Sequence, residues 1–161
     1  MNQVQSIMDS FRRIVRALRT SSRISESHLG LRTAQVFVLQ QLERCEPVSL
    51  NELAEKTYSH QSTVSVVVNT LVKKGYVCRK AREGDRRFLV LETTAKGKAL
   101  LKKQSLTIQE QFSSVIQNME PKERKELARL LELFVTSAGL GKEPPHFFFE
   151  KEAKSKLKNR F

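Results

Sequence analysis

Apolar residues recur at helical spacing near both ends of the chain, with polar and basic residues between them. The first segment runs from Val4 to Leu18 and is interleaved with arginines, the pattern of an amphipathic helix. A second stripe covers 108–119, and Pro121 opens a further helix whose apolar positions continue to Phe134. These helices could pack on each other within one chain. Their large apolar surface favours the alternative, in which both ends jointly build a homodimer interface.

The middle of the chain has shorter segments with clear boundaries. Residues 33–43 predict one helix, and Ser49 followed by Glu52 has the S-x-x-E form of a capping box that opens a second, short helix. A connection over 57–60 leads into a third helix, which Gly75 ends. The apolar face of this third helix consists of Val64, Val67, Val68 and Leu71. Two short helices joined by a tight turn predict a helix-turn-helix.

The hydrophobic period changes to two after Gly75. Residues 77–80 and 88–91 alternate as paired strands, with Gly84 in the loop between them, so they predict a β-hairpin. A long helix is expected from near Ala95, capped by one of the two threonines before it. The fold class is therefore mainly α with a small β-hairpin (α+β), in the form of a winged helix-turn-helix.

The outer face of the third helix is the first candidate binding surface. With its apolar side turned inward, a step of about 100° per residue places a polar set on the other side. This set, with its flanking positions, comprises Gln61, Ser62, Thr63, Ser65, Val66, Asn69, Thr70 and Lys73. No acid lies between His60 and Lys74, whereas a merely solvated face would normally carry Glu and Lys. Amides can pair with adenine and Val66 can meet a thymine methyl, so the face predicts a major-groove contact, with His60 as a helix cap or phosphate contact.

The hairpin carries a local excess of positive charge. Residues 73–87 contain seven cations against Glu83 and Asp85. Those on or near the hairpin are Arg79, Lys80, Arg82, Arg86 and Arg87. Cations so placed can reach phosphates or enter a narrow minor groove, and we expect Asp85 to form an ion pair with an arginine that fixes the shape of the loop. The alternative is a solvated hairpin tip whose charges contribute little.

Composition narrows the class of protein further. The 161 residues fit one domain, and the net charge of +12 with a pI near 10.1 favours an anionic partner such as nucleic acid. No window resembles a membrane span or a secretory signal, so a cytoplasmic location without membrane attachment is predicted. Cys45 and Cys78 lack the spacing of a zinc site. They are predicted to be ordinary packed thiols, and no metal or cofactor is expected.

Four segments of the middle region carry a resemblance to a known family. They are Leu53-Ala54-Glu55-Lys56, His60-Gln61-Ser62-Thr63-Val64-Ser65, Leu71-Val72-Lys73-Lys74-Gly75-Tyr76-Val77 and Asp85-Arg86-Arg87. Their combination over about 30–100 resembles the core pattern of the MarR family of bacterial transcription regulators. The resemblance implies an obligate homodimer of winged-helix lobes that binds double-stranded DNA at a pseudo-palindromic operator and usually represses.

The same resemblance assigns roles to individual residues. It places Gln61, Ser62, Thr63, Ser65, Val66 and Asn69 in the major groove, and makes Asp85 and Arg87 the wing pair with Arg86 near the minor groove. Val66 departs from the family, because many relatives carry a larger polar or basic side chain there. Base preference therefore does not transfer. The resemblance also implies a possible small-molecule effector, for which no ligand residues are assigned.

We expect four regions along the chain. Residues 1–30 form an N-terminal dimerisation helix, 31–93 the DNA-binding lobe, and 94–140 long C-terminal dimerisation helices. Residues 141–161 form a tail in which Phe147, Phe148 and Phe149 make an apolar cluster, followed by a basic run. This cluster would dock on the dimer or a partner, or belong to a largely disordered end.

Competing functions remain open from the sequence. No nucleophile motif, phosphate-binding loop or H-E-x-x-H pattern is present, so an enzyme is not expected. A non-specific architectural DNA binder would also explain the charge, and a winged helix can serve as a protein-interaction module. The acid-free helix face and basic wing favour a sequence-specific regulator over both.

Overall fold

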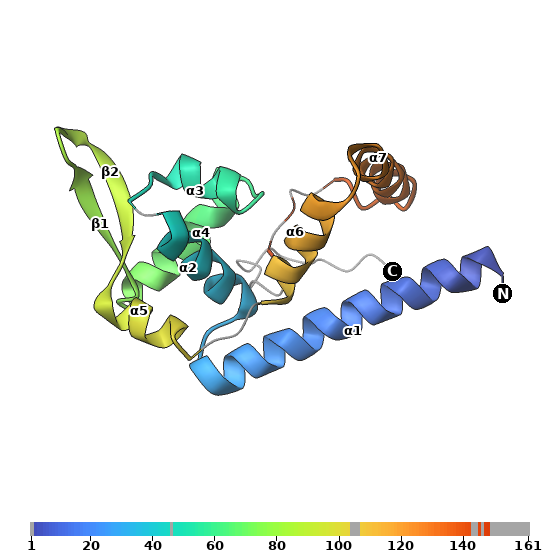
Figure 1. Ribbon diagram of the computed structural model, residues 1–161, viewed down its shortest axis with the longest axis horizontal. Helices are drawn as coiled ribbons and strands as arrows, with labels where there is room; N and C mark the ends of the chain where they lie inside the picture. Colours follow the sequence, from blue (N-terminus) through green and yellow to red (C-terminus); the bar gives the residue numbers. More distant parts are fainter. Residues whose placement is uncertain (1, 46, 104–106, 143–144, 146, 149–161) are drawn as a thin grey trace.

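The computed structural model describes residues 2–45, 47–103, 107–142, 145 and 147–148. Its elements follow the chain in the order α1 (Gln3–Leu29), α2 (Thr33–Cys45), α3 (Leu50–Lys56), α4 (Gln61–Lys73), β1 (Val77–Arg82), β2 (Asp85–Thr93), α5 (Ala95–Leu101), α6 (Ile108–Asn118) and α7 (Pro121–Ser137). In Figure 1 the lobe of α2 to β2 lies at one end, and the long α1 extends away from it beneath α6 and α7. The predicted winged helix-turn-helix class is confirmed.

The core of the lobe forms where α2, α3 and α4 meet the hairpin. The four predicted inward positions of α4, Val64, Val67, Val68 and Leu71, are fully buried and pack with apolar residues of α2 and α3. At the start of α3, the Ser49 hydroxyl accepts from the backbone N–H of Glu52, whose carboxylate accepts from the N–H of Ser49. The predicted capping box is thus confirmed, and it fixes where the helix-turn-helix begins.

The wing is a two-stranded antiparallel hairpin with one additional bridge to a residue outside its strands. Val77 pairs with Thr93, and the register shifts between Ala81 and Arg82 before the turn at Gly84, whose φ is 85°. Val48 adds an isolated bridge to Leu91 through two backbone hydrogen bonds of 3.4 and 2.7 Å. This bridge ties the base of the wing to the α2–α3 connection, so the wing extends from a fixed base.

The long helix expected from Ala95 is wrong as a single element. Thr94 caps α5 as predicted, but α5 ends at Leu101 and a new helix starts at Ile108. Thr107 and Glu110 form a second capping box at that start. The side chains of this box satisfy backbone groups that a continuous helix would have bonded internally, and so they favour a fresh helix start.

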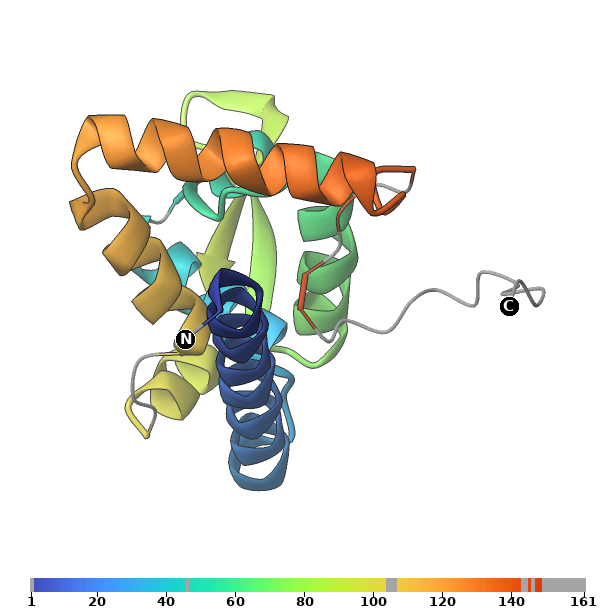
Figure 2. The same ribbon diagram turned by 90° about the vertical axis from the view of Figure 1, so that its right-hand side faces the viewer.

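The terminal helices leave a broad apolar surface uncovered in the single chain. Figure 2 shows α7 crossing α1 steeply, and the rings of Phe11 and Phe134 meet with centroids 5.1 Å apart. Within the described chain, α7 contributes no buried side chain. Exposed apolar residues of α1, α6 and α7 include Val4, Ile7, Met8, Ile14, Val15, Val115, Ile116, Leu130, Leu131, Leu133 and Phe134. None of the described helices is long and apolar enough to cross a membrane.

Candidate nucleic-acid interface

The outer face of α4 presents most of the side chains expected there. Gln61, Ser62, Val66, Asn69 and Lys73 are exposed, and Ser65 and Thr70 are half-buried. Of the two roles expected of His60, a helix cap or a phosphate contact, the structure bears only on the first. His60 occupies the N-cap position, but its side chain makes no capping hydrogen bond to a described residue.

Thr63 differs from the other candidate residues of α4 because its side chain is buried. Its hydroxyl donates to the backbone carbonyl of Pro145 over 3.2 Å. The step from inward Val64 to Thr63 already places this side chain at the flank of the outer face. A contact with the C-terminal segment then covers it. We therefore leave Thr63 out of the DNA-facing set that we propose below.

The tip of the wing is shaped by one acid and one arginine. The guanidinium of Arg87 donates from Nε to Oδ1 and from Nη2 to Oδ2 of Asp85, both at 3.1 Å, and the backbone N–H of Arg87 also donates to Oδ1. The expected pairing of Asp85 with an arginine is confirmed. These bonds favour the carboxylate and lower the pKa of Asp85 below its ordinary value. The exposed Arg86 stands beside this pair in the sequence.

Three further contacts involve basic side chains of the wing strands. Arg82 lies 3.7 Å from the carboxylate of Glu52 in α3, while Lys80 pairs with Glu92 across the hairpin. Arg79 in β1 donates from Nη2 to Oδ1 of Asn69 in α4 at 2.5 Å. The hydrophobic pattern of the sequence did not predict that Arg79 would contact α4. The first two contacts neutralise nearby acids, and the third holds one basic side chain beside an amide of α4.

The arrangement suits recognition of a polyanion that displays hydrogen-bonding edges. The face of α4 offers amides, hydroxyls and one exposed valine, and the wing offers exposed arginines, of which Arg87 is held by its pair with Asp85. Side chains of these kinds contact base edges and phosphates respectively. Among the described residues, no group of three or more His, Cys, Asp or Glu side chains could hold a metal ion.

The C-terminal segment packs on its own lobe. The ring of Phe147 meets Phe37 of α2 edge to face, with centroids 6.3 Å apart, and Phe147 joins the periphery of the lobe core. Phe148 is half-exposed. Phe147 is therefore docked, as one of the alternatives expected of the cluster, but its contacts are with the lobe of its own chain. The expectations for Phe149 and for the basic run lie outside the described residues.

Comparisons with known proteins agree with this geometry. A MarR family model matches residues 31–88, and an uncharacterised HTH-type transcriptional regulator of Bacillus cereus is 32% identical over 125 residues, covering 74% of this chain and 82% of that protein. A crystal structure of a MepR-like protein complexed with pseudoligands has 26% identity and a TM-score of 0.56, covering 86% of this chain and 99% of the other. Streptococcus pneumoniae FabT in complex with DNA shares the fold, with a TM-score of 0.57 at 19% identity, covering 86% of this chain and 99% of the other.

Members of the matched family are transcriptional regulators and not enzymes. The chain belongs to the MarR family of DNA-binding, winged helix-turn-helix transcriptional regulators.

Proposed function

We propose that this protein is a sequence-specific repressor that binds a pseudo-palindromic operator as a homodimer and is released by a small-molecule ligand. The recognition set on α4 comprises His60, Gln61, Ser62, Ser65, Val66, Asn69 and Lys73. The wing set comprises Arg79, Arg82, Asp85, Arg86 and Arg87, with Asp85 acting through its arginine. The α4 set reads base edges, and the wing set binds the phosphate backbone and the minor groove.

One observation carries the proposal that α4 recognises a specific DNA sequence. The exposed face of α4 contains no acid and stands next to the basic wing, while the four apolar positions behind it are fully buried. A helix held so firmly by its inner face can present its outer side chains to a groove without rearrangement. Amide side chains pair with adenine in two hydrogen bonds, and Val66 suits a thymine methyl. A purely electrostatic binder would need no such face.

The uncovered apolar surface supports the dimer. Ile7 is 54% exposed and Leu131 is 45% exposed, and such side chains belong to a surface too large for a soluble monomer to leave in water. A second copy of the chain would bury it around a two-fold axis. Two lobes related in this way present two recognition helices to successive turns of the duplex, which matches an inverted repeat.

Repression and ligand release rest on likeness to relatives and on one feature of this chain. The MepR-like structure holds pseudoligands, and FabT is seen with DNA. In this chain a pocket of about 320 Å³ lies between the helix-turn-helix and α6, a volume suited to a small ligand. Occupancy there could shift the lobe relative to the terminal helices and so change the spacing of the two recognition helices.

In vitro selection from random duplex DNA at about 150 mM salt tests the proposal, because non-specific phosphate binding weakens steeply as salt rises. We expect enrichment of an inverted repeat with half-sites about one helical turn apart. Binding at low salt without any enriched motif would indicate an architectural DNA binder instead. Absence of DNA binding at either salt concentration would favour a protein-interaction module.

A further inference from the structure

Tyr58, in the turn between α3 and α4, occupies a backbone position that favours glycine. Its φ is 52°, and among the residues that the structure describes no other non-glycine residue has a positive φ. The N–H of Tyr58 donates to the carbonyl of Glu55, and the N–H of Ser59 donates to that of Ala54. These two bonds form the Schellman pattern that ends a helix, in which glycine is common because a Cβ is strained there. A tyrosine therefore destabilises the turn on which the helix-turn-helix depends.

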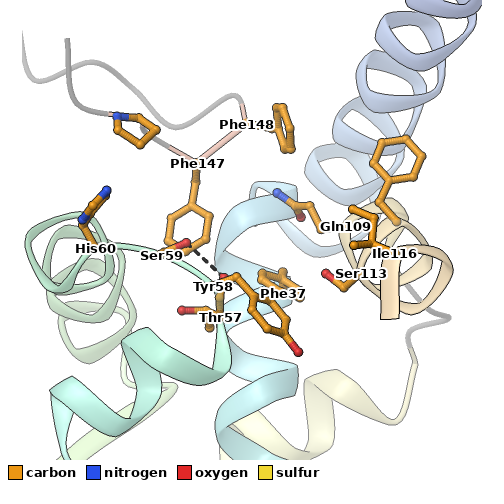
Figure 3. A pocket seen from close by; sticks show the side chains of 12 residues that line it. Phe37, Thr57, Tyr58, Ser59, His60, Gln109, Ser113, Ile116, Phe147 and Phe148 are labelled. Carbon is orange, nitrogen blue, oxygen red and sulfur yellow. Dashed lines mark hydrogen bonds between the residues drawn. The ribbon is translucent and has the colours of Figure 1, made fainter. Parts of the chain in front are cut away.

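The side chain of Tyr58 contacts a helix outside the DNA-binding lobe. Gln117 of α6 donates from Nε2 to the Tyr58 hydroxyl. Figure 3 shows Tyr58 and Phe37 of α2 between the α3–α4 turn and Ser113 of α6. The strained backbone of Tyr58 thus coincides with a direct contact between the turn and α6. A glycine at this position would relieve the strain but could not make the contact.

A second polar contact ties α6 to the lobe near its other end. Glu110, in the first turn of α6, is buried and pairs with Arg44 of α2, whose Nη1 lies 2.7 Å from Oε1 of Glu110. The same Oε1 accepts from Nε2 of Gln41 over 3.4 Å. Glu110 and Gln117 lie about two helical turns apart, so their side chains project from the same side of α6. Because two fixed points define the direction of a helix, both contacts are needed to orient α6 relative to the lobe.

Helix α6 also belongs to the part of the chain that we propose dimerises. Its Val115 and Ile116 are exposed apolar residues, and the helix contacts α1. The hydrogen bond from Gln117 to Tyr58 therefore joins the helix-turn-helix to the helices that carry the uncovered apolar surface. In the proposed dimer, the angle between α6 and this turn determines the distance and the rotation that relate the two recognition helices.

We propose that Tyr58 is a positioning residue. Through its hydrogen bond with Gln117 it holds the helix-turn-helix at one angle to α6, and so it restricts the half-site spacing that the dimer accepts. The inference rests on the proposed function and deepens it, because it names the residue pair that selects spacing, whereas the exposed face of α4 selects bases. The strained tyrosine is tolerated because a glycine would leave the turn free to move relative to α6.

Anisotropy titrations on two duplexes test this role. One is the selected inverted repeat, and the other has one base pair inserted at its centre, which separates the half-sites by about 3.4 Å more and rotates them by about 35°. The spacing ratio is the dissociation constant on the lengthened duplex divided by that on the selected duplex. Tyr58→Phe and Gln117→Leu should each lower this ratio at least about threefold, and the double variant should lower it no further, because either change removes the same hydrogen bond.

Gln111→Leu and Tyr76→Phe are the matched controls. Gln111 is exposed on α6, and Tyr76 is the other tyrosine of the chain. Both variants should keep the spacing ratio of the parent. A merely structural role of Tyr58 would weaken binding to both duplexes by one factor and leave the ratio unchanged. An unchanged ratio in Tyr58→Phe or in Gln117→Leu would therefore overturn the proposal.

Tyr58→Gly separates the shape of the turn from the contact with α6. Glycine suits a φ of 52°, so this variant should unfold at a higher urea concentration than the parent. Loss of the side chain should nevertheless lower the spacing ratio as far as Tyr58→Phe does. A stabilised Tyr58→Gly variant with the spacing ratio of the parent would show that Tyr58 serves only to end α3.

Spin labels test the orientation of α6 without DNA. Nitroxides are attached at Asn51→Cys in α3 and Lys122→Cys in α7, both exposed positions, in a chain whose two native cysteines are replaced by serine. The labelled chain is diluted into unlabelled protein, so that double electron–electron resonance reports distances within one chain. The distance distribution should be narrow in the parent and broader in Tyr58→Phe. Identical distributions would overturn the proposal whether or not a duplex is selected, whereas the absence of an enriched inverted repeat would count against the proposed function alone.

Discussion

Nη2 of Arg79 donates to Oδ1 of Asn69 over 2.5 Å and thereby joins the first strand of the wing to the recognition helix. The contact orients the Asn69 amide and leaves its Nδ2 donors available. It also holds a cation beside the face that we propose enters the major groove. In the proposed function, base reading by α4 and backbone binding by the wing would therefore share one side-chain pair.

This pair predicts non-additive effects on DNA binding. Asn69→Ala and Arg79→Ala should each weaken binding to the selected duplex, and the double variant should lose less than the product of the two effects, by at least about twofold. The reason is that either single change already breaks the contact. Fluorescence anisotropy on labelled duplex measures all four dissociation constants. Effects that simply multiply would mean that the contact has no role in DNA binding.

The Asp85–Arg87 pair predicts the pH behaviour of the wing. Hydrogen bonds from Arg87 lower the pKa of Asp85, so its carboxylate form is favoured in the folded protein. A depressed carboxyl pKa means that the pairing is present above the ordinary value of 3.8 and is lost as the pH falls through the lower, folded value. Between about pH 5 and 8 the pair should stay intact.

Asp85→Asn separates the charge of this residue from its shape. The variant should bind selected and scrambled duplexes more weakly by the same factor, because a neutral amide holds the Arg87 guanidinium less firmly. Its profile of affinity against pH from about 5 to 8 should run parallel to that of the parent. A parent profile that changes in this range while the variant profile stays flat would contradict the assignment.

The exposed apolar side of α1 predicts dimerisation through the terminal helices. Ile7→Glu places a charge on a side chain that the proposed interface would bury, so sedimentation equilibrium should shift from twice the 18.5 kDa chain mass toward a single chain. Gln5→Glu, an exposed polar position on the same helix, should remain dimeric. A dimeric Ile7→Glu variant, or a monomeric parent protein, would place the interface elsewhere or remove it.

Close packing at Gly97 predicts a stability change without an effect on DNA contacts. A Cβ at Gly97 would lie 2.5 Å from the backbone oxygen of Tyr76, so α5 would have to move away from the end of the wing. Gly97→Ala should lower the free energy of unfolding by about 1–3 kcal/mol. Gly141→Ala has open space around it and should be close to neutral. Urea denaturation measures both, and equal stability of the two variants would refute the packing argument.

Local sequence patterns predicted the parts of the fold that depend on near neighbours. The buried side of α4 follows from helical spacing, and the capping box of α3 from Ser49 and Glu52. The local pattern also predicted that Asp85 pairs with an arginine, while only the resemblance to the family named Arg87 as that arginine. The break between α5 and α6 could have been predicted as well. Thr107 and Glu110 have the T-x-x-E spacing of a capping box, which is a local signal for the start of α6.

Contacts between distant parts of the chain could not be predicted in this way. Thr63 and Pro145 are 82 positions apart, and neither periodicity nor composition indicates that one covers the other. The same holds for Phe147 against Phe37, and for the buried amide of Gln109, which has no hydrogen-bond partner among the residues that the structure describes. Each depends on how α6 and the C-terminal segment pack against the lobe, which is a property of the tertiary structure.

The most direct test of the account compares specificity ratios for two variants. The dissociation constants of the parent, Gln61→Ala and Arg87→Ala are measured on the selected inverted repeat and on a scrambled duplex of equal composition, at about 150 mM salt. Arg87→Ala should weaken binding to both duplexes by the same factor, and Gln61→Ala should mainly reduce the difference between them. Proportional losses on both duplexes for both variants would contradict the claim that α4 reads sequence while the wing holds the backbone.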